Sequence, residues 1–398
     1  SRFRCRLRAL CRKSSTTLFC YKYMKSSLSI LVCTRDLDRY SVSMLQELER
    51  MGHRVHVLIE PQSGPHARDW SSDVSIVEQV KLNGRFDKHA AQRYADNIKK
   101  YAADVCLCYT SRALSVALTA RRHHAFNVPV VGTRGAIGGV NAFYLQDWFA
   151  YLSPSLDAVA CMSRAIANKL TREARRLYPR HPGHFQTIYP GYGQLLGAHE
   201  PPVARLRLEN QNVRLLCVAN DRPIKGLAVL LDAVENHLQS TNWQLDIVGQ
   251  CGDAIRTRIK ASGKLSSHVT AHGFRSDVPD FFRAAHIYIQ PTLQPGEGIG
   301  NSMAEAMSFG LPVITSNVGG GIELTDHEKT GLHFQVGDSS GLAQAIDRLI
   351  LDPNLCDVLG MAAADTLQER FSLRQEASEF LTLFETLINK RHLQSVHC

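Results

Sequence analysis

The stretch Pro291–Gly331, PTLQPGEGIGNSMAEAMSFGLPVITSNVGGGIELTDHEKTG, decides how the rest of the chain is interpreted. The apolar run from His286 to Gln290 precedes it and predicts a buried strand. That strand ends in a turn rich in proline and glycine, and a helix is predicted to begin near Asn301. A strand, a glycine-rich turn and a helix in this order are typical of α/β proteins.

The residues in this turn predict the kind of ligand it binds. Gly296, Gly298 and Gly300 leave backbone N–H groups open, and the following helix N-terminus carries partial positive charge, so the turn suits an anion. Two carboxylates, Glu297 and Glu305, lie beside it, eight positions apart. An anion site next to two carboxylates indicates a phosphate joined to a group rich in hydroxyls, as in a nucleotide-sugar.

A dinucleotide site is the competing interpretation of a glycine-rich turn. The pattern Gly-x-Gly-x-x-Gly would need a third glycine where this chain has Asn301. No complete fingerprint follows the first predicted strand either, which argues against a dehydrogenase.

The stretch resembles the donor-sugar signature of the retaining glycosyltransferases of family 4. That signature is a Glu, seven residues, a second Glu, an apolar helix, Gly-x-Pro-Val, and a Gly-Gly pair with a Glu. The matching positions are Glu297, Glu305, Gly310 to Val313, Gly319-Gly320, Glu323, Thr330 to Leu332, and Gly337-Asp338. The resemblance is strong over residues 205–355, weaker over 28–200 and absent over 1–25.

The resemblance implies the α/β fold called GT-B, in which two Rossmann-like β/α/β domains face each other across a cleft. A C-terminal helix then crosses back to the first domain. Alternating strand and helix patterns and a length of 398 residues agree with two such domains. We expect a basic arm over 1–25, an acceptor-side domain over 26–195, a donor domain over 196–372, and a helix and tail over 373–398. The crossover is predicted near residues 190–205, where Pro201-Pro202 marks a stiff linker.

Roles for individual residues are implied by the same resemblance. Arg222 and Lys225 match the family's cations that clamp the donor diphosphate, and Glu305 matches the carboxylate at the ribose hydroxyls. Glu297 is expected to bind sugar hydroxyls and, with Arg222 and Lys225, to form the catalytic set. The remaining expected donor contacts are Gly298, Ile299, Gly300, Asn301, Ser302, Gly273 and Phe274.

The first domain departs from the family pattern in two loops. Relatives carry Gly-Gly after the first strand, where this chain has Thr34-Arg35, and His-Gly after a later strand, where it has Arg134-Gly135. An arginine can pair with carboxylate or phosphate through two hydrogen bonds. Because these loops lie where relatives contact the sugar or the acceptor, the candidate contacts are Thr34, Arg35, Arg134 and Gly135. A surface or hinge position is the alternative for Arg134, and solvent is the alternative for Arg35.

The net charge of +9 comes almost entirely from one segment. Residues 1–25 carry eight Lys or Arg and no acidic residue, and the rest of the chain is close to neutral. A solvated tail, an arm that binds anionic lipid and an organelle transit peptide all fit this composition. We favour a fourth explanation, in which Met24 is the natural start, because the first strand begins just after it.

The 11 cysteines are scattered without a disulfide framework, and we expect most of them to act as small buried apolar residues. Cys106 and Cys108 lie two apart in a predicted strand. We expect them to point to opposite faces and to be poor metal partners. Together with the absence of Asn-x-Ser/Thr, this suits a reducing cytosolic compartment.

These observations predict an enzyme that moves a sugar from a nucleotide-diphosphate-sugar to a glycan or lipid-linked acceptor. By resemblance, the anomeric configuration is retained and neither a metal nor another cofactor is required. We expect a cytoplasmic protein, in contact with the inner face of a membrane, that binds no nucleic acid. The alternatives are a catalytically silent GT-B protein that binds nucleotide-sugars, and a nucleotide-sugar epimerase.

Overall fold

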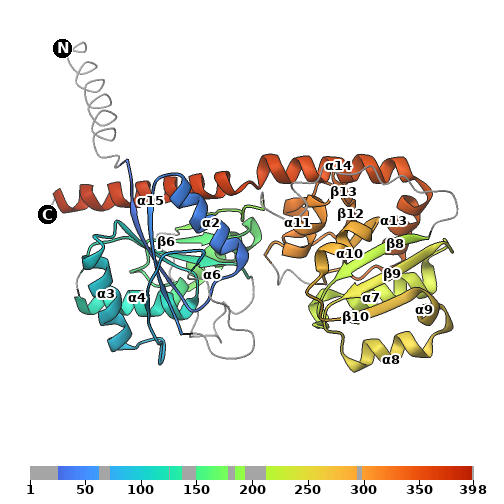
Figure 1. The fold of residues 1–398 in the computed structure, drawn as a ribbon, viewed down its shortest axis with the longest axis horizontal. Helices are drawn as coiled ribbons and strands as arrows, with labels where there is room; N and C mark the ends of the chain where they lie inside the picture. Colours follow the sequence, from blue (N-terminus) through green and yellow to red (C-terminus); the bar gives the residue numbers. More distant parts are fainter. Residues whose placement is uncertain are drawn as a thin grey trace, which may run out of the picture.

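The computed structural model describes residues 26–61, 72–124, 126–136, 149–177, 184–192, 212–293 and 298–396. Within them the chain forms two halves, and each is a parallel β-sheet with helices packed on its faces (Figure 1). This architecture confirms the predicted GT-B arrangement of two Rossmann-like domains. The predicted arm over 1–25 and the linker at Pro201-Pro202 lie outside the described residues.

The first sheet has the strand order β3-β2-β1-β4-β5-β6-β7, with every neighbouring pair parallel. Its strands are β1 (Ser29–Thr34), β2 (Arg54–Ile59), β3 (Ile76–Gln79), β4 (Val105–Cys108), β5 (Val130–Arg134), β6 (Ala158–Cys161) and β7 (Phe185–Thr187). Helices cover both faces, so the central strands are buried along their whole length, which explains why they appear in the sequence as unbroken apolar runs.

The helices of the first half are α2 (Arg39–Arg50), α3 (Lys88–Lys100), α4 (Ser111–His124) and α6 (Arg164–Leu177). Asp38 caps α2 by accepting from the Ser41 amide, and Asp87 caps α3 by accepting from two amides of its first turn. Each helix begins directly after a strand or its loop, so α2 and α6 start at the carboxyl edge of the sheet.

The second sheet has the order β10-β9-β8-β11-β12-β13 and is also parallel. Its strands are β8 (Val213–Val218), β9 (Trp243–Val248), β10 (Val269–Gly273), β11 (Ile287–Gln290), β12 (Val313–Ser316) and β13 (Gly331–Phe334). The α-helices are α7 (Leu227–Asp232), α8 (Asp253–Ala261), α9 (Gly263–His268), α10 (Val278–Ala284), α11 (Asn301–Ser308), α12 (Gly321–Leu324), α13 (Ser339–Leu351) and α14 (Pro353–Arg370). A 3₁₀ turn, η1 (Pro223–Lys225), precedes α7, and a π-helical turn, η2 (Ala233–His237), follows it.

The last helix, α15 (Leu373–Val396), leaves the second half and lies along the first, as Figure 1 shows in red. Its apolar face shares one core with α2 and the first sheet, and Ala377 and Phe384 are fully buried there. Near its end, Arg391 donates to Asp157 at 2.7 Å, just before β6. The predicted crossing helix is therefore confirmed.

Several elements differ from the sequence prediction. The chain forms an additional edge strand, β3, and the short helices α8, α9 and α10, where no element was predicted. The segment from Leu227 to His237 is not one regular helix, because α7 is followed there by the turn η2. In the described part of the chain, no helix combines the length and the apolar character needed to cross a bilayer.

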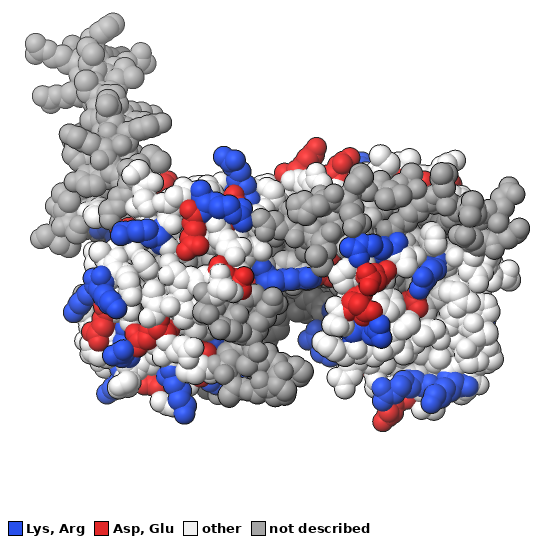
Figure 2. Space-filling model, viewed as in Figure 1, with Lys and Arg blue, Asp and Glu red and all other residues white. Residues whose placement is uncertain are grey.

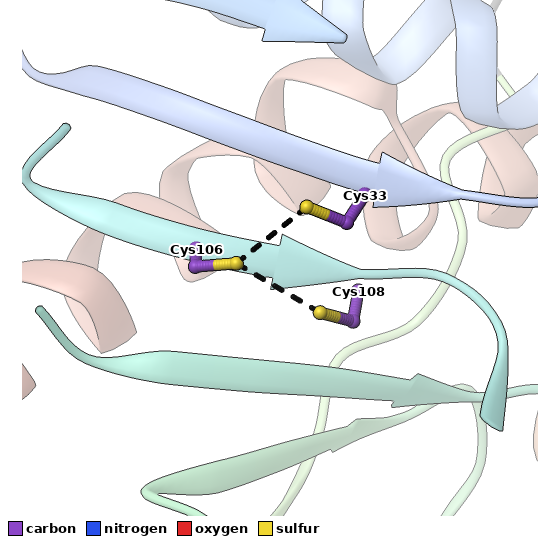
Figure 3. Close-up of side chains that lie close together, drawn as sticks. All are labelled: Cys33, Cys106 and Cys108. Atoms are coloured by element: carbon purple, nitrogen blue, oxygen red, sulfur yellow. Dashed lines mark hydrogen bonds between the residues drawn. The ribbon is translucent and has the colours of Figure 1, made fainter. Parts of the chain in front are cut away.

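The expectation about Cys106 and Cys108 was wrong. Side chains alternate along a strand, so residues two apart share a face instead of pointing apart. Both thiols lie on the same side of β4, with 3.9 Å between their sulfurs, and the Cys33 thiol on β1 lies 3.7 Å from that of Cys106 (Figure 3). All three cysteines are buried in the core beneath α3 and α4.

Candidate active site between the two halves

The candidate donor site lies at the carboxyl edge of the second sheet, where open α/β sheets bind ligands. Strands β8 and β11 are neighbours there, so the loops that follow them meet. The Leu293 amide donates to the Ile224 carbonyl at 2.8 Å. Gly226 has φ +70°, and a Cβ on it would lie 1.8 Å from the Pro291 carbonyl oxygen, so only glycine permits this approach.

The cations predicted to hold a diphosphate are at this junction. Arg222 and Lys225 follow β8, with Lys225 half-buried in the turn η1 and Arg222 exposed. The Arg222 guanidinium donates to Asn220 at 3.1 Å. Figure 2 shows a hollow between the two lobes on the face that it presents, with basic side chains beside it on the wall of the second lobe.

Helix α11 places its N-terminus at the same edge. Gly300 is its N-cap and supplies no side-chain cap, so the first amides of the helix are available to an anion. Ser302 fixes the start of the helix, because Tyr288 donates to its hydroxyl at 2.8 Å and that hydroxyl donates to the Val218 carbonyl of β8 at 3.5 Å. The structure thus brings the cation loop and the helix N-terminus to neighbouring strand ends.

Glu305, the predicted ribose carboxylate, points from α11 toward the first half. Tyr40 of α2 donates its hydroxyl to Glu305 Oε1 at 2.5 Å, and Arg39 forms an ion pair with the same oxygen. Burial raises the pKa of Tyr40 to about 12 although Arg39 favours the phenolate, so Tyr40 remains a neutral donor. The Glu305 carboxylate of the second half is thus already bonded to two residues of the first half before any ligand binds.

Gly298 and Gly135 meet across the cleft. A Cβ on Gly298 would lie 2.4 Å from the carbonyl oxygen of Gly135, and a Cβ on Gly320 would lie 1.8 Å from the Gly298 carbonyl oxygen. The donor turn is therefore packed between a predicted acceptor-side loop and the Gly-Gly pair of the signature. Ile299 beside it joins a cluster that contains Tyr40 and Tyr192.

The remaining first-half candidates are placed at the carboxyl ends of their strands. Thr34 is buried at the end of β1 and its hydroxyl donates to the Asp36 carbonyl at 2.5 Å, so it holds the loop. Arg35 is exposed and pairs with Glu60 at 3.4 Å, beyond β2. Arg134, at the end of β5, donates to the Ala136 carbonyl at 2.8 Å and lies over the Tyr151 ring, 4.9 Å from its centroid.

Two of the expected donor contacts, Gly273 and Phe274, lie at the far end of the same sheet edge. Gly273 ends β10 with φ +71°, and its carbonyl accepts from the Gly249 amide at 2.8 Å. Phe274 follows with 83% of its surface exposed, which leaves its ring face open to a base. Glu297, predicted to bind sugar hydroxyls, lies outside the described residues.

Residues of the first half that reach the donor helix were missed in the sequence. Besides Arg39 and Tyr40, Tyr192 donates to Asn301 Oδ1 at 3.1 Å and packs edge-on against Tyr40, with ring centroids 5.5 Å apart. The one available signal was the cluster of aromatic residues at the crossover, Tyr189-Pro190-Gly191-Tyr192.

The thiols of Cys33, Cys106 and Cys108 are the one group of three metal-ligand side chains found in the described part of the chain (Figure 3). In those residues no histidine or carboxylate joins them as a fourth ligand. Three thiolates around a divalent ion would leave a net negative charge in an apolar, fully buried setting, which is costly. The cluster therefore acts as core packing, and burial raises the pKa of the Cys33 and Cys108 thiols.

Comparison with known families matches both halves. Residues 37–192 match the family model described as Glycosyltransferase Family 4, and residues 212–352 match the one described as Glycosyl transferases group 1. The second range contains the whole second sheet, and the first range contains the first sheet except for β1. They contain both sides of the cleft described above.

Among curated proteins, the lipopolysaccharide core biosynthesis glycosyltransferase LpsD of Rhizobium meliloti is 30% identical over 194 residues, 48% of this chain and 55% of the relative. The phosphatidyl-myo-inositol mannosyltransferase of Mycobacterium leprae is 31% identical over 170 residues, 42% of this chain and 44% of the relative. The chain thus matches about half the length of these relatives.

Among solved structures, a glycosyltransferase from Rickettsia africae superimposes with a TM-score of 0.75 at 20% identity, covering 92% of this chain and 99% of that one. Anabaena HepE in complex with UDP gives a TM-score of 0.70 at 18% identity, covering 89% and 100%. At these identities the likeness establishes the shared two-domain fold.

Proposed function

Since the chain belongs to the family 4 glycosyltransferases, we propose that it transfers a sugar from a nucleotide-diphosphate-sugar to a glycan or lipid-linked acceptor. Three observations support this proposal: the Arg222–Lys225 loop contacts the loop after β11, the N-terminus of α11 has no side-chain cap, and the Glu305 carboxylate faces the first half. An anion-binding edge next to a carboxylate that accepts from hydroxyls suits a diphosphate attached to ribose and sugar.

The chemistry proposed for this cleft breaks the bond between the anomeric carbon and the donor diphosphate. Negative charge builds on the departing diphosphate, where Arg222, Lys225 and the α11 amides stabilise it. Glu305 accepts from the ribose hydroxyls and Glu297 from the sugar hydroxyls. The acceptor oxygen attacks the same face, and the departing phosphate takes its proton, so the anomeric configuration is retained.

We propose that the reaction requires no metal ion, because fixed positive groups of the protein already face the leaving diphosphate. UDP bound to the related fold of HepE supports a nucleoside diphosphate as the ligand of the second half. Relatives named for lipopolysaccharide core and phosphatidyl-myo-inositol support a glycan or lipid-linked acceptor. The reaction is proposed to take place in the cytoplasm, at the inner face of a membrane.

A panel of nucleotide-sugars incubated with the protein tests this function. We expect slow release of free nucleotide from one donor, and loss of that release in Glu305→Gln. Lys225→Ala should lower the rate at least about 100-fold, as for other groups that stabilise charge in a transition state. Lys260→Ala, an exposed lysine on α8 of the same half, is the matched control and should keep the wild-type rate.

Two further measurements separate the parts of the proposal. Activity that persists in excess EDTA supports a metal-independent reaction, and activity lost in EDTA and restored by a divalent ion contradicts it. The anomeric coupling constant of the product, measured by NMR, tests retention.

A silent GT-B protein is the second candidate, supported by the departures at Thr34-Arg35 and Arg134-Gly135. Thermal stabilisation by a nucleotide-sugar, without turnover on any acceptor, would favour it. Sugar isomers that form without an acceptor would instead indicate an epimerase.

A further inference from the structure

Helix α6 of the first half begins in contact with the second half. Its first two amides, those of Arg164 and Ala165, donate to the two carboxylate oxygens of Glu323 at 2.7 and 2.9 Å. The third amide, that of Ile166, donates to the hydroxyl of Ser163 at 3.3 Å. The first three amides of this helix therefore all have acceptors. The Ile166 amide donates within its own domain, and the other two amides donate across the cleft.

The Glu323 side chain is enclosed on the remaining side by the crossover segment. Tyr189 donates its hydroxyl to Glu323 Oε2 at 2.7 Å, and the Arg164 guanidinium lies 3.5 Å from the same oxygen. Glu323 is only 7% exposed. A carboxylate this deeply buried is tolerated because each oxygen accepts hydrogen bonds and the α6 N-terminus carries partial positive charge.

Glu323 is also connected to the donor turn through its own element. It lies on α12, directly after the glycine run 319–321, and its amide donates to the Gly320 carbonyl at 3.0 Å. Gly320 in turn packs against the Gly298 carbonyl of the donor turn. A displacement of α6 relative to α12 would therefore change the position of Gly135 relative to Gly298.

From these contacts we infer that Glu323 is a positioning residue that holds the two halves at the separation needed for sugar transfer. Its carboxylate acts as the N-terminal cap of a helix in the other domain and touches neither donor nor acceptor. The role in transfer rests on the proposed function, whereas the role in domain separation does not.

The test uses the full chain with Glu323→Gln, which keeps the shape of the side chain and removes its charge, and Glu323→Ala, which removes both. Glu369→Gln is the matched control, because Glu369 is an exposed glutamate on α14 of the same half. Circular dichroism first verifies that each variant is folded. Small-angle X-ray scattering then reports the separation of the halves without reference to activity.

We expect a larger radius of gyration for Glu323→Ala than for wild type and Glu369→Gln, with Glu323→Gln between them. Scattering curves of folded Glu323→Ala that superimpose on wild type would overturn the inference. Tyr189→Phe removes one donor from the other side of the contact and should produce part of the same change. If Glu323→Ala does not fold, Glu323→Gln and Tyr189→Phe decide the result.

Kinetic and binding measurements separate positioning from ligand contact. The second half alone supplies the proposed diphosphate site, so UDP affinity by titration calorimetry should weaken by no more than about twofold in Glu323→Gln. Turnover with an acceptor should fall about tenfold, equivalent to about 1.4 kcal/mol of lost positioning. Weaker UDP binding with unchanged turnover at saturation would overturn the positioning role. If the wild-type protein binds no nucleotide, the proposed function is overturned. The scattering result would then still test whether Glu323 sets the separation of the two halves.

Discussion

Glu305 shows how one side chain joins the two halves of the cleft. Its carboxylate accepts from Tyr40 and pairs with Arg39, both on a helix 265 positions earlier in the sequence. The role proposed for the same oxygens is to accept from ribose hydroxyls, so a donor has to displace at least one of these partners. If Glu305 has this proposed role, residues of the first domain compete with the donor for the carboxylate.

Replacing Tyr40 by Phe should tighten the binding of UDP up to about tenfold. The substitution removes one hydrogen bond to a charged group, and such bonds contribute about 1.5 to 3 kcal/mol, part of which is regained from water. The ring contact with Tyr192 is kept, because Phe retains the aromatic ring. Titration calorimetry with UDP measures the effect.

Tyr101→Phe provides the control, since Tyr101 lies at the end of α3, away from the cleft. Its UDP affinity should equal that of wild type. Weaker UDP binding by Tyr40→Phe would instead mean that Tyr40 itself contacts the nucleotide.

At the scale of single residues, the sequence carries a stronger signal for the donor side than for the acceptor side. Arg222, Lys225 and Glu305 follow strands in a fixed spacing that a family signature preserves. Arg39, Tyr40 and Tyr192 reach the site only because the two domains face each other, and no local pattern encodes that contact. The absence of a local signal explains why these three residues were missed.

The donor turn, the loop between β11 and α11, depends on close contacts that only glycine permits. Gly226, Gly298 and Gly320 each lie where a side chain would collide with a carbonyl oxygen of another segment. Among these three glycines, Gly298 was predicted to leave its amide open for an anion. The structure adds that they also allow three loops and the opposite domain to approach one another.

A methyl group at position 298 tests this close approach. Gly298→Ala would place a Cβ 2.4 Å from the Gly135 carbonyl oxygen, a backbone atom that cannot move aside without shifting its loop. We expect turnover to fall at least about tenfold, since small displacements of positioning groups have large effects on rate, while the melting temperature changes little. Steady-state rates and calorimetry measure both.

Gly263→Ala is the control for this substitution, because a Cβ at Gly263 meets no atom within 4 Å. It should keep the wild-type rate. Equal rates for Gly298→Ala and wild type would show that the halves separate before transfer.

Most strands and long helices were predicted at the element scale, because buried strands and amphipathic helices leave clear periodic patterns. The edge strand β3 was missed since it has only four residues and none of them is fully buried. The error at Cys106 and Cys108 came from assigning residues two apart in a strand to opposite faces, whereas such residues share a face.

At the scale of the molecule, the crossover and α15 meet at a half-buried acid. Glu376 of α15 accepts from the Gly191 amide at 2.7 Å, next to the point where Gly191 packs against the Leu373 backbone. Burial of the carboxyl group, with Asp38 and Glu379 as nearby negative charges, raises the pKa of Glu376 to about 8. The folded protein therefore keeps this acid protonated at neutral pH.

This pKa gives the stability a predictable dependence on pH. The folded state holds a proton that an unfolded glutamate releases near pH 4.3, so the free energy of unfolding should fall as pH rises from about 5 to about 8. Glu376→Gln resembles the protonated form and should remove this fall. Because part of the side chain reaches the surface, we expect a gain of about 2 kcal/mol at pH 8 to 9 and little change at pH 5.

Urea unfolding of wild type and Glu376→Gln at several pH values measures this difference. Glu379→Gln, a half-buried neighbour on the same helix, is the control and should keep most of the wild-type slope. Parallel curves for wild type and Glu376→Gln would show that Glu376 is ionised in the folded protein.

The return of α15 to the first half has a consequence for biosynthesis. Residues of this helix, among them Leu373, Ala377 and Phe384, fill the core against β1, β2 and α2. A ribosome delivers those strands hundreds of residues before the helix that covers them, so one apolar face of the first sheet stays open while the second domain is being made. The amino-terminal domain is therefore the last to be completed, and holding chaperones would be needed most during that interval.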